Sequence, residues 1–163
     1  MTSDMRIVNS GEVEWSSRSS PSGRFARSER LISEALGRDR RSTNSDERHP
    51  FDVAITRVPP GASSCPFHSH SAQWEFFHVV SGTGTVRHAD GTRAVRAGDA
   101  FLFKPNEPHQ LTNDGTEDLV VYVVADNPIG ETCYYPDSNK WAVKSPDYRL
   151  IRGEPLDYFD GEE

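Results

Sequence analysis

The sequence predicts an all-β protein, built as an antiparallel jelly-roll barrel, and three observations support this fold class. Between residues 51 and 124, short runs rich in β-branched and aromatic residues recur at regular intervals. Turn formers separate the runs, and Asp90-Gly91 is the strongest hairpin signal among them. The 163 residues contain no internal repeat, so we expect one barrel rather than two. Evenly spaced short strands are typical of antiparallel barrels and jelly rolls.

The predicted strands follow one another with turn residues between them. Pro59, Pro60 and Gly61 end the first run, and Asp114-Gly115 precedes the last one. The strands are expected at residues 51–58, about 68–70, 74–81, 83–88, 93–96, 100–103, 109–113 and 119–124.

Residues 1–50 are expected to form an irregular N-terminal arm. They are rich in serine and arginine and have few large apolar side chains, which favours an arm over a core. One short helix is predicted within the arm at residues 28–36, with Ser28 as its cap and Gly37 as its stop.

Residues 51–125 are expected to form the barrel, and residues 126–163 a C-terminal tail. The tail carries Tyr134, Tyr135 and Trp141 among turn formers. Aromatic side chains in such a segment favour packing across the barrel or against a partner subunit.

Charge and hydropathy exclude several classes of partner. The net charge is −7 and the calculated pI is near 5.4, which argues against nucleic acid because phosphate binding requires clustered lysine and arginine. No apolar stretch approaches the roughly 20 residues of a membrane span, and the N-terminal residues lack the apolar core of a secretory signal. The sequence therefore predicts a cytoplasmic protein that binds neither nucleic acid nor membrane.

Polar side chains occur where the strand pattern predicts a buried face. His68 and His70 project from the same side of an extended segment, so their imidazoles converge. In the next run Glu75 shares a face with Phe77 and Val79. A carboxylate there requires a partner, because its desolvation is costly, and a metal ion bound with histidines supplies one.

His109 is the third predicted imidazole of this site. It follows a turn made by Pro105, Asn106 and Pro108, and it begins a strand whose inward face is apolar behind it. Three imidazoles and the Glu75 carboxylate suit one divalent transition metal ion per subunit, either Mn, Fe, Co, Ni, Cu or Zn, better than calcium or magnesium. The sequence does not choose among these metals.

These residues resemble the two motifs of the cupin superfamily over about residues 59–113. The matching positions are Gly61, His68, His70, Glu75, Gly82, Gly98, His109 and Asn113. The chain resembles small single-domain cupins that are compared with sugar-phosphate isomerases. The resemblance implies a jelly-roll barrel, the metal ligands His68, His70, Glu75 and His109, and a homodimer. Light scattering at micromolar concentration tests the dimer.

The chain departs from the cupin pattern at three places. The spacing between Gly61 and His68 is one residue longer than usual, and Lys104 and Asn106 replace a proline and a glycine. Asparagine tolerates the left-handed backbone of a turn glycine. Lys104 puts a cation beside His109, so it is a predicted substrate contact, and Gln73, between the histidine pair and Glu75, is another.

The remaining histidines and the cysteines receive structural interpretations. His49, His78 and His88 are expected to be structural or exposed, since His78 lies on the strand face opposite the predicted metal ligand. Cys65 and Cys133 are expected to be reduced thiols that mainly pack.

Three functions stay open at this point, and with them the question of whether the protein is an enzyme. The first is a metal-dependent, isomerase-like reaction on a small polyoxygenated metabolite, with Glu75 in the catalytic site. The second is an iron-dependent dioxygenase. The third is a non-catalytic sugar- or metabolite-binding module, because no acid–base pair beyond the metal shell is visible in the sequence. Fold alone does not decide among them.

Overall fold

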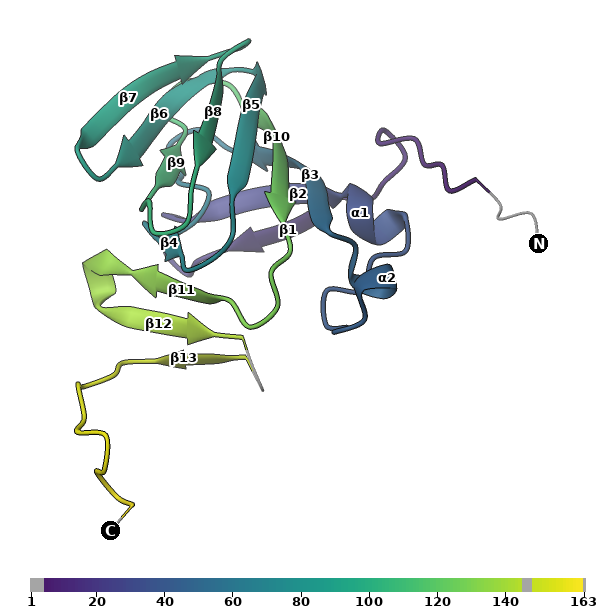
Figure 1. Ribbon diagram of the computed structural model, residues 1–163. Coiled ribbons are helices and arrows are strands. Elements are labelled where there is room, and N and C mark those ends of the chain that lie inside the picture. Colours follow the sequence, from purple (N-terminus) through teal and green to yellow (C-terminus); the bar gives the residue numbers. More distant parts are fainter. Residues whose placement is uncertain (1–4, 145–147, 163) are drawn as a thin grey trace.

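The computed structural model describes residues 5–144 and 148–162, which form three antiparallel sheets with little helix (Figure 1). The largest sheet has six strands, which in spatial order are β1 (Ser16–Ser19), β2 (Ala26–Leu31), β3 (Phe51–Val58), β10 (Leu119–Asp126), β5 (Glu75–Ser81) and β8 (Ala100–Phe103). A three-stranded sheet is made by β7 (Gly91–Arg96), β6 (Thr83–His88) and β9 (Gln110–Thr112). A four-stranded sheet contains β13 (Arg149–Ile151), β12 (Lys140–Val143), β11 (Thr132–Tyr135) and β4 (Ser69–His70).

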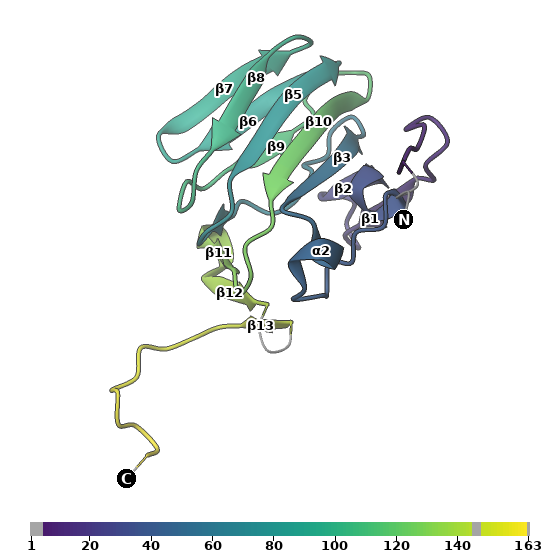
Figure 2. The same ribbon diagram turned by 45° about the vertical axis from the view of Figure 1, so that its right-hand side comes forward.

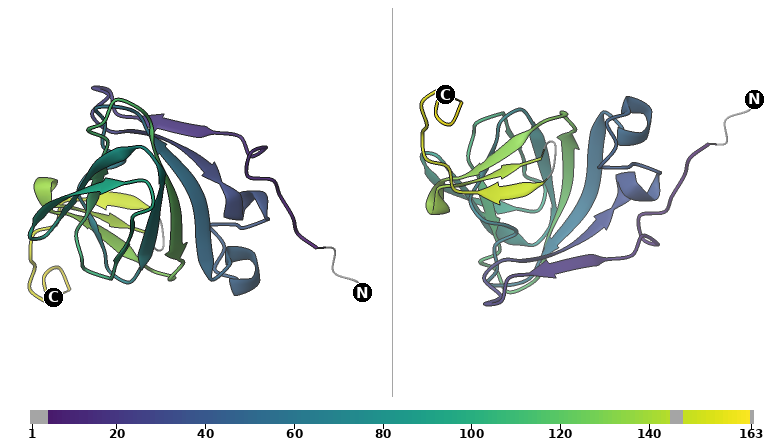
Figure 3. Two further views of the ribbon diagram at one scale, coloured as in Figure 1. Left: turned by 90° about the horizontal axis from the view of Figure 1, so that it is seen from above. Right: turned by 90° about the horizontal axis from the view of Figure 1, so that it is seen from below.

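The sheets curl around a common interior, as the view along the barrel shows (Figure 3). Alternate residues of the strands point inward and meet in one apolar cluster between the six-stranded and the three-stranded sheet. Its buried members are Val58, Ala62, Val79, Val86, Leu111, Leu119 and Val121. This arrangement confirms the predicted all-β jelly roll.

Strand boundaries in the barrel follow the sequence pattern closely. Strands β3, β6 and β8 begin and end at the predicted residues. Strand β10 continues to Asp126, because each of its residues from Leu119 onward is paired with β3. Along β5 the inward residues Glu75, Phe77 and Val79 alternate with the exposed Phe76, His78 and Val80, as the period of two predicts.

The predicted helix at residues 28–36 is wrong at its start. Residues Ser28–Leu31 belong to β2 and pair with Arg57–Ala54 of β3, so sheet hydrogen bonds override the local helix signal. Only α1 (Ile32–Ala35) is helical here, and Gly37, whose φ is +96°, follows its C-cap Leu36, as the predicted stop requires. A second short helix, α2 (Ser45–Arg48), precedes β3. Strands β1 and β2 thus extend the barrel sheet, while the domain boundary at residue 50 stays a prediction.

The C-terminal region contains strands that the sequence did not reveal. Strands β11, β12 and β13 form a meander, joined in part by the 3₁₀ helix η1 (Pro136–Ser138), and β11 pairs with β4. They close one end of the barrel, whereas residues 152–162 extend away from it (Figure 2). Within residues 5–144 and 148–162, no helix has the length and apolar character needed to cross a membrane.

Two of the motif positions serve the fold rather than the site. Gly82 has φ +82°, and a Cβ atom there would lie 2.6 Å from the carbonyl oxygen of Asp118. The fully buried Asn113 donates from Nδ2 to the carbonyl oxygens of Val58 at 2.7 Å and Glu117 at 2.8 Å. Gly82 therefore allows two chain segments to approach closely, and Asn113 joins two segments by hydrogen bonds.

Candidate metal centre

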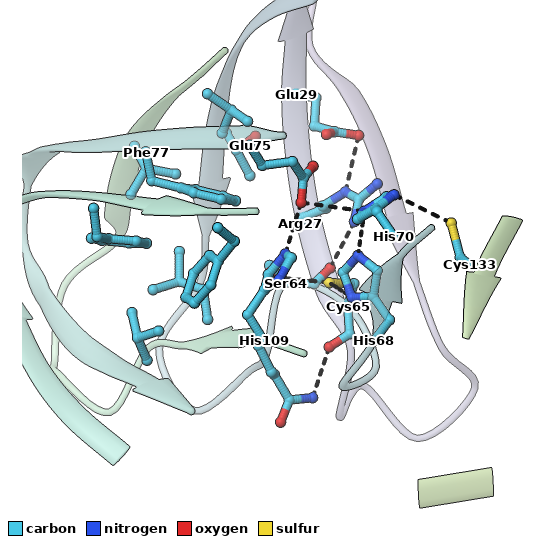
Figure 4. A pocket seen from close by; sticks show the side chains of 18 of the residues that line it. Arg27, Glu29, Ser64, Cys65, His68, His70, Glu75, Phe77, His109 and Cys133 are labelled. Atoms are coloured by element: carbon cyan, nitrogen blue, oxygen red, sulfur yellow. Dashed lines mark hydrogen bonds and ion pairs between the residues drawn. The ribbon is translucent and has the colours of Figure 1, made fainter. Parts of the chain in front are cut away.

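The four predicted ligands converge on one point (Figure 4). One donor atom from each of His68, His70, Glu75 and His109 lies within 4.8 Å of all the others. His68 Nε2 is 3.0 Å from His70 Nε2, and Glu75 Oε2 is 2.7 Å from His109 Nε2 and 3.3 Å from His70 Nε2. The sequence thus identified a cluster that the fold assembles from two separate segments.

Backbone pairing brings the two histidine segments together. His68 N donates to the carbonyl oxygen of His109 at 3.1 Å, and His109 N donates back to His68 O at 2.8 Å. The turn before His109 is attached to the same segment, because Asn106 N donates to His70 O at 2.7 Å. Asn106 has φ +68°, which confirms that it adopts the left-handed turn conformation.

The outer nitrogen of each imidazole is bound by an acceptor outside the cluster. The Nδ1 partners are Pro66 O for His68 at 3.0 Å, Glu131 Oε1 for His70 at 2.6 Å and Glu107 O for His109 at 3.0 Å. A carbonyl or carboxylate oxygen can only accept, so Nδ1 of each ring carries a proton and a ligand bond would form at Nε2. Three Nε2 atoms and one carboxylate oxygen facing a common point fit a divalent transition metal.

Hydrogen bonds keep His70 charged before a metal binds. Burial lowers the pKa of its imidazole, but hydrogen bonds with Cys133, Glu131 and Glu75 raise the pKa to about 12. At neutral pH, His70 is therefore an imidazolium between two carboxylates, with Nδ1 toward Glu131 and Nε2 toward Glu75.

Glu75 and His68 also have shifted pKa values, and their charge states complement the positive charge of His70. Burial raises the pKa of the Glu75 carboxyl, but hydrogen bonds from His109 and His70 lower it well below its usual range. Burial lowers the pKa of His68 to about 4, so this imidazole is neutral at pH 7. The free site thus contains the Glu75 carboxylate beside the His70 cation, and a metal ion would replace the proton of that cation.

Metal binding is expected to release about one proton per ion at pH 7, because His70 must lose its Nε2 proton to coordinate. Titration calorimetry in buffers of different ionisation enthalpy measures this number. The pKa of His70 is raised above the ordinary 6.5, so its contribution to the stability of the metal-free protein is full below pH 6.5 and is lost as pH rises toward 12. Metal affinity should rise across the same window. Release near zero would contradict the assignment of His70.

Glu131 contacts the candidate site from a segment that the sequence predicted to be a tail. It is 2% exposed, and its second carboxylate oxygen forms a short ion pair with Lys144. Glu131, Cys133 and His70 also have donor atoms within 4.8 Å of one another. The signal available in the sequence is an acidic residue directly before a β-branched and aromatic run at residues 132–135.

A cavity of about 240 Å³ opens beside the cluster. One part of its wall is aromatic and aliphatic, and the ring of Phe103 stacks on His109 with centroids 4.2 Å apart. The other part is polar and includes Arg27, Glu29 and Tyr135. Arg27 and Glu29 come from β2, so a segment predicted to be an arm supplies charged groups to the cavity.

Gln73 and Lys104 do not line this cavity. The Gln73 side chain donates to Asp126 O, and Lys104 Nζ lies 6.0 Å from the centroid of the Trp74 ring. Their contact with a substrate stays a prediction.

The cysteines and the remaining histidines occupy two different environments. Both Cys65 and Cys133 are free thiols that line the cavity, as expected for reduced cysteines. His49, His78 and His88 are not among its lining residues.

The barrel residues match a known protein family. A family model described as "Cupin domain" matches residues 54–125. Residues 54–125 are therefore similar to cupin domains. No curated protein matches the chain.

Solved structures share the fold of most of the chain. A candidate sugar phosphate isomerase from Acidithiobacillus ferrooxidans is 22% identical with a TM-score of 0.76, and the match covers 90% of this chain and 92% of that one. A sugar phosphate isomerase from a cupin superfamily, from Silicibacter pomeroyi, is 24% identical with a TM-score of 0.75, over 93% and 97% of the two chains. A predicted oxalate decarboxylase from Thermotoga maritima is 21% identical with a TM-score of 0.60, over 75% and 99%. At these identities the likeness concerns the fold.

Proposed function

We propose that this cupin binds one divalent transition metal through His68, His70, Glu75 and His109 and acts on a small polyoxygenated metabolite by proton transfer, as a sugar isomerase does. The observation that carries this proposal is the convergence of three Nε2 atoms and one carboxylate oxygen at a small cavity. The chemistry that such an ion supplies is polarisation of a carbonyl or hydroxyl oxygen as a Lewis acid.

Two groups of the cavity wall supply the acid–base chemistry that the sequence left unassigned. Glu29 lines the cavity, and its carboxylate takes a proton from the hydroxyl-bearing carbon next to a substrate carbonyl and returns it to the former carbonyl carbon. The proton of that hydroxyl passes to the former carbonyl oxygen, so the product is the isomeric hydroxycarbonyl compound. Burial raises the pKa of Tyr135, so its phenol stays protonated and can donate to a substrate oxygen. The aromatic wall around Phe77 and Phe101 limits water at the reacting carbons.

The test starts from the full chain reconstituted with manganese or zinc. Thermal-shift screening against sugars, sugar phosphates and keto acids identifies ligands, and each ligand is then incubated with the protein under argon. Isomerised product, with deuterium incorporated in heavy water, is the expected result. Glu29→Gln should lower turnover by about 10²-fold to 10⁴-fold while metal content stays unchanged.

Other outcomes would separate the alternatives. Oxygen consumption by the iron-loaded protein, with no reaction under argon, would overturn the isomerase proposal in favour of a dioxygenase. Ligands that bind without turnover would make the protein a binding module. The homodimer, the cytoplasmic location and the absence of nucleic-acid and membrane partners stay predictions from the sequence.

A further inference from the structure

Arg27 is the one lysine or arginine among the described residues that line the cavity. It lies on the inward face of β2 with Glu29, two residues along the strand, and it reaches the space beside the metal ligands (Figure 4). Its Nη1 donates to Ser64 O at 3.2 Å, and its Nε is 3.0 Å from Glu29 Oε2. A positive charge is therefore held at the wall of the proposed active site.

The contacts within the chain leave part of this guanidinium unused. Arginine carries five N–H donors in a planar fork. The hydrogen bond to Ser64 O uses Nη1 and the ion pair with Glu29 lies at Nε, so Nη2 has no acceptor among the described residues. A ligand oxygen in the cavity would supply an acceptor for these Nη2 donors.

The charges around the cavity favour a ligand with one negative charge. The Arg27 cation is balanced by Glu29, and Glu75 leaves a divalent ion with one positive charge in excess. Glu131 and Lys144 form a separate pair that cancels. A carboxylate supplies one negative charge and matches the planar fork of arginine, whereas a phosphate monoester carries nearly two charges at neutral pH.

We propose that the ligand is a small polyoxygenated carboxylic acid, whose carboxylate is bound by Arg27 while its hydroxyl or carbonyl oxygens face the His68, His70, Glu75 and His109 cluster. This inference rests on the proposed function and narrows its substrate class from sugars and sugar phosphates to hydroxy and keto acids. The cavity of about 240 Å³ is smaller than the roughly 300–1,000 Å³ of pockets for drug-sized ligands, which favours a short carbon chain.

Three matched probes test this inference: glycerate, glycerol and glycerol 3-phosphate. All three have a three-carbon backbone. Glycerate has a carboxylate in place of one CH2OH group of glycerol, and glycerol 3-phosphate has a phosphate ester on one hydroxyl. Calorimetric titration of the manganese-loaded full chain should show glycerate binding about 10-fold to 100-fold more tightly than either of the others. Glycerol 3-phosphate is expected to bind little more tightly than glycerol. The Arg27 guanidinium is already paired with Glu29, so it does not balance the nearly two negative charges of the phosphate.

The variants separate Arg27 from general effects of removing a cation. Arg27→Gln should remove the preference for glycerate while metal content and glycerol binding stay unchanged, and Arg27→Lys should restore only part of it because the planar fork is lost. Arg30→Gln is the control on the same strand, since Arg30 contacts Trp15, 4.5 Å from its ring centroid, and does not line the cavity. It should retain the full preference.

Several results would overturn the inference without touching the proposed function. These are metal uptake with equal binding of glycerate and glycerol, tighter binding of glycerol 3-phosphate, or an equal loss in the Arg27→Gln and Arg30→Gln variants. If the wild-type protein takes up no metal, the proposed function fails. The titrations are then repeated on the metal-free protein, where a glycerate preference that depends on Arg27 supports the inference and its absence overturns it.

Discussion

The double variant His68→Ala, His70→Ala is expected to contain no bound metal, whereas the wild-type protein purified without chelator should contain about one divalent ion per chain. The variant loses two of the four donors, including the imidazole that Glu131 orients. Only Glu75 and His109 would then remain, and two donors do not complete the coordination of a transition metal. Elemental analysis by mass spectrometry measures the metal content directly.

Thermal unfolding measures the loss of metal binding in the double variant independently. A ligand that binds only the folded chain stabilises it by about 2.7 kcal/mol at a concentration 100 times its dissociation constant. Added zinc or manganese should therefore raise the melting temperature of the wild-type protein and leave that of the double variant unchanged. The double variant His78→Ala, His88→Ala is the matched control, because it removes two histidines that do not line the cavity. Equal and negligible metal in wild type and variant would refute the site.

Glu131→Gln is expected to weaken metal binding by about 10-fold to 100-fold, the range typical of residues that orient a metal-bound histidine. Glu131 Oε1 lies 2.6 Å from His70 Nδ1, and its carboxylate strengthens His70 as a ligand and holds the ring with Nε2 toward the cluster. An amide of nearly the same shape keeps the packing and removes the charge. Competition with a chromophoric chelator measures the affinity.

The variant Lys144→Gln separates orientation of His70 from general stability of this region. It breaks the ion pair with Glu131 and leaves the bond from Glu131 to His70 in place. Its metal affinity should fall much less than that of Glu131→Gln. The cobalt absorption spectrum is a second reading, since a reoriented imidazole changes it and a loss of stability alone does not. Equal affinity losses in the two variants would contradict the positioning role.

Much of the barrel was predictable because its strands obey a period of two that burial enforces. Strand β5 alternates Glu75, Phe77 and Val79 inward with exposed residues between them, and any slip by one residue would expose the apolar set. The four candidate ligands follow the same pattern, so the sequence predicted that His68, His70, Glu75 and His109 would lie in one cluster.

Other features could not be predicted because they depend on contacts between distant segments. Residues 28–31 have a local helix signal, yet their pairing with β3 makes them a strand. Glu131 is far along the chain from His70, and only the pairing of β11 with β4 brings it to the imidazole.

The sequence by itself determined the all-β class, the positions of the barrel strands along the chain and the four candidate ligands, because each of these is a local pattern of residue types. Tertiary structure alone decided which groups surround those donors. Glu131 orients His70, and Arg27 and Glu29 face the cavity, because long-range strand pairing places them there. The physical reason is that side-chain direction is set by each strand, whereas neighbours across the barrel are set by how the sheets close.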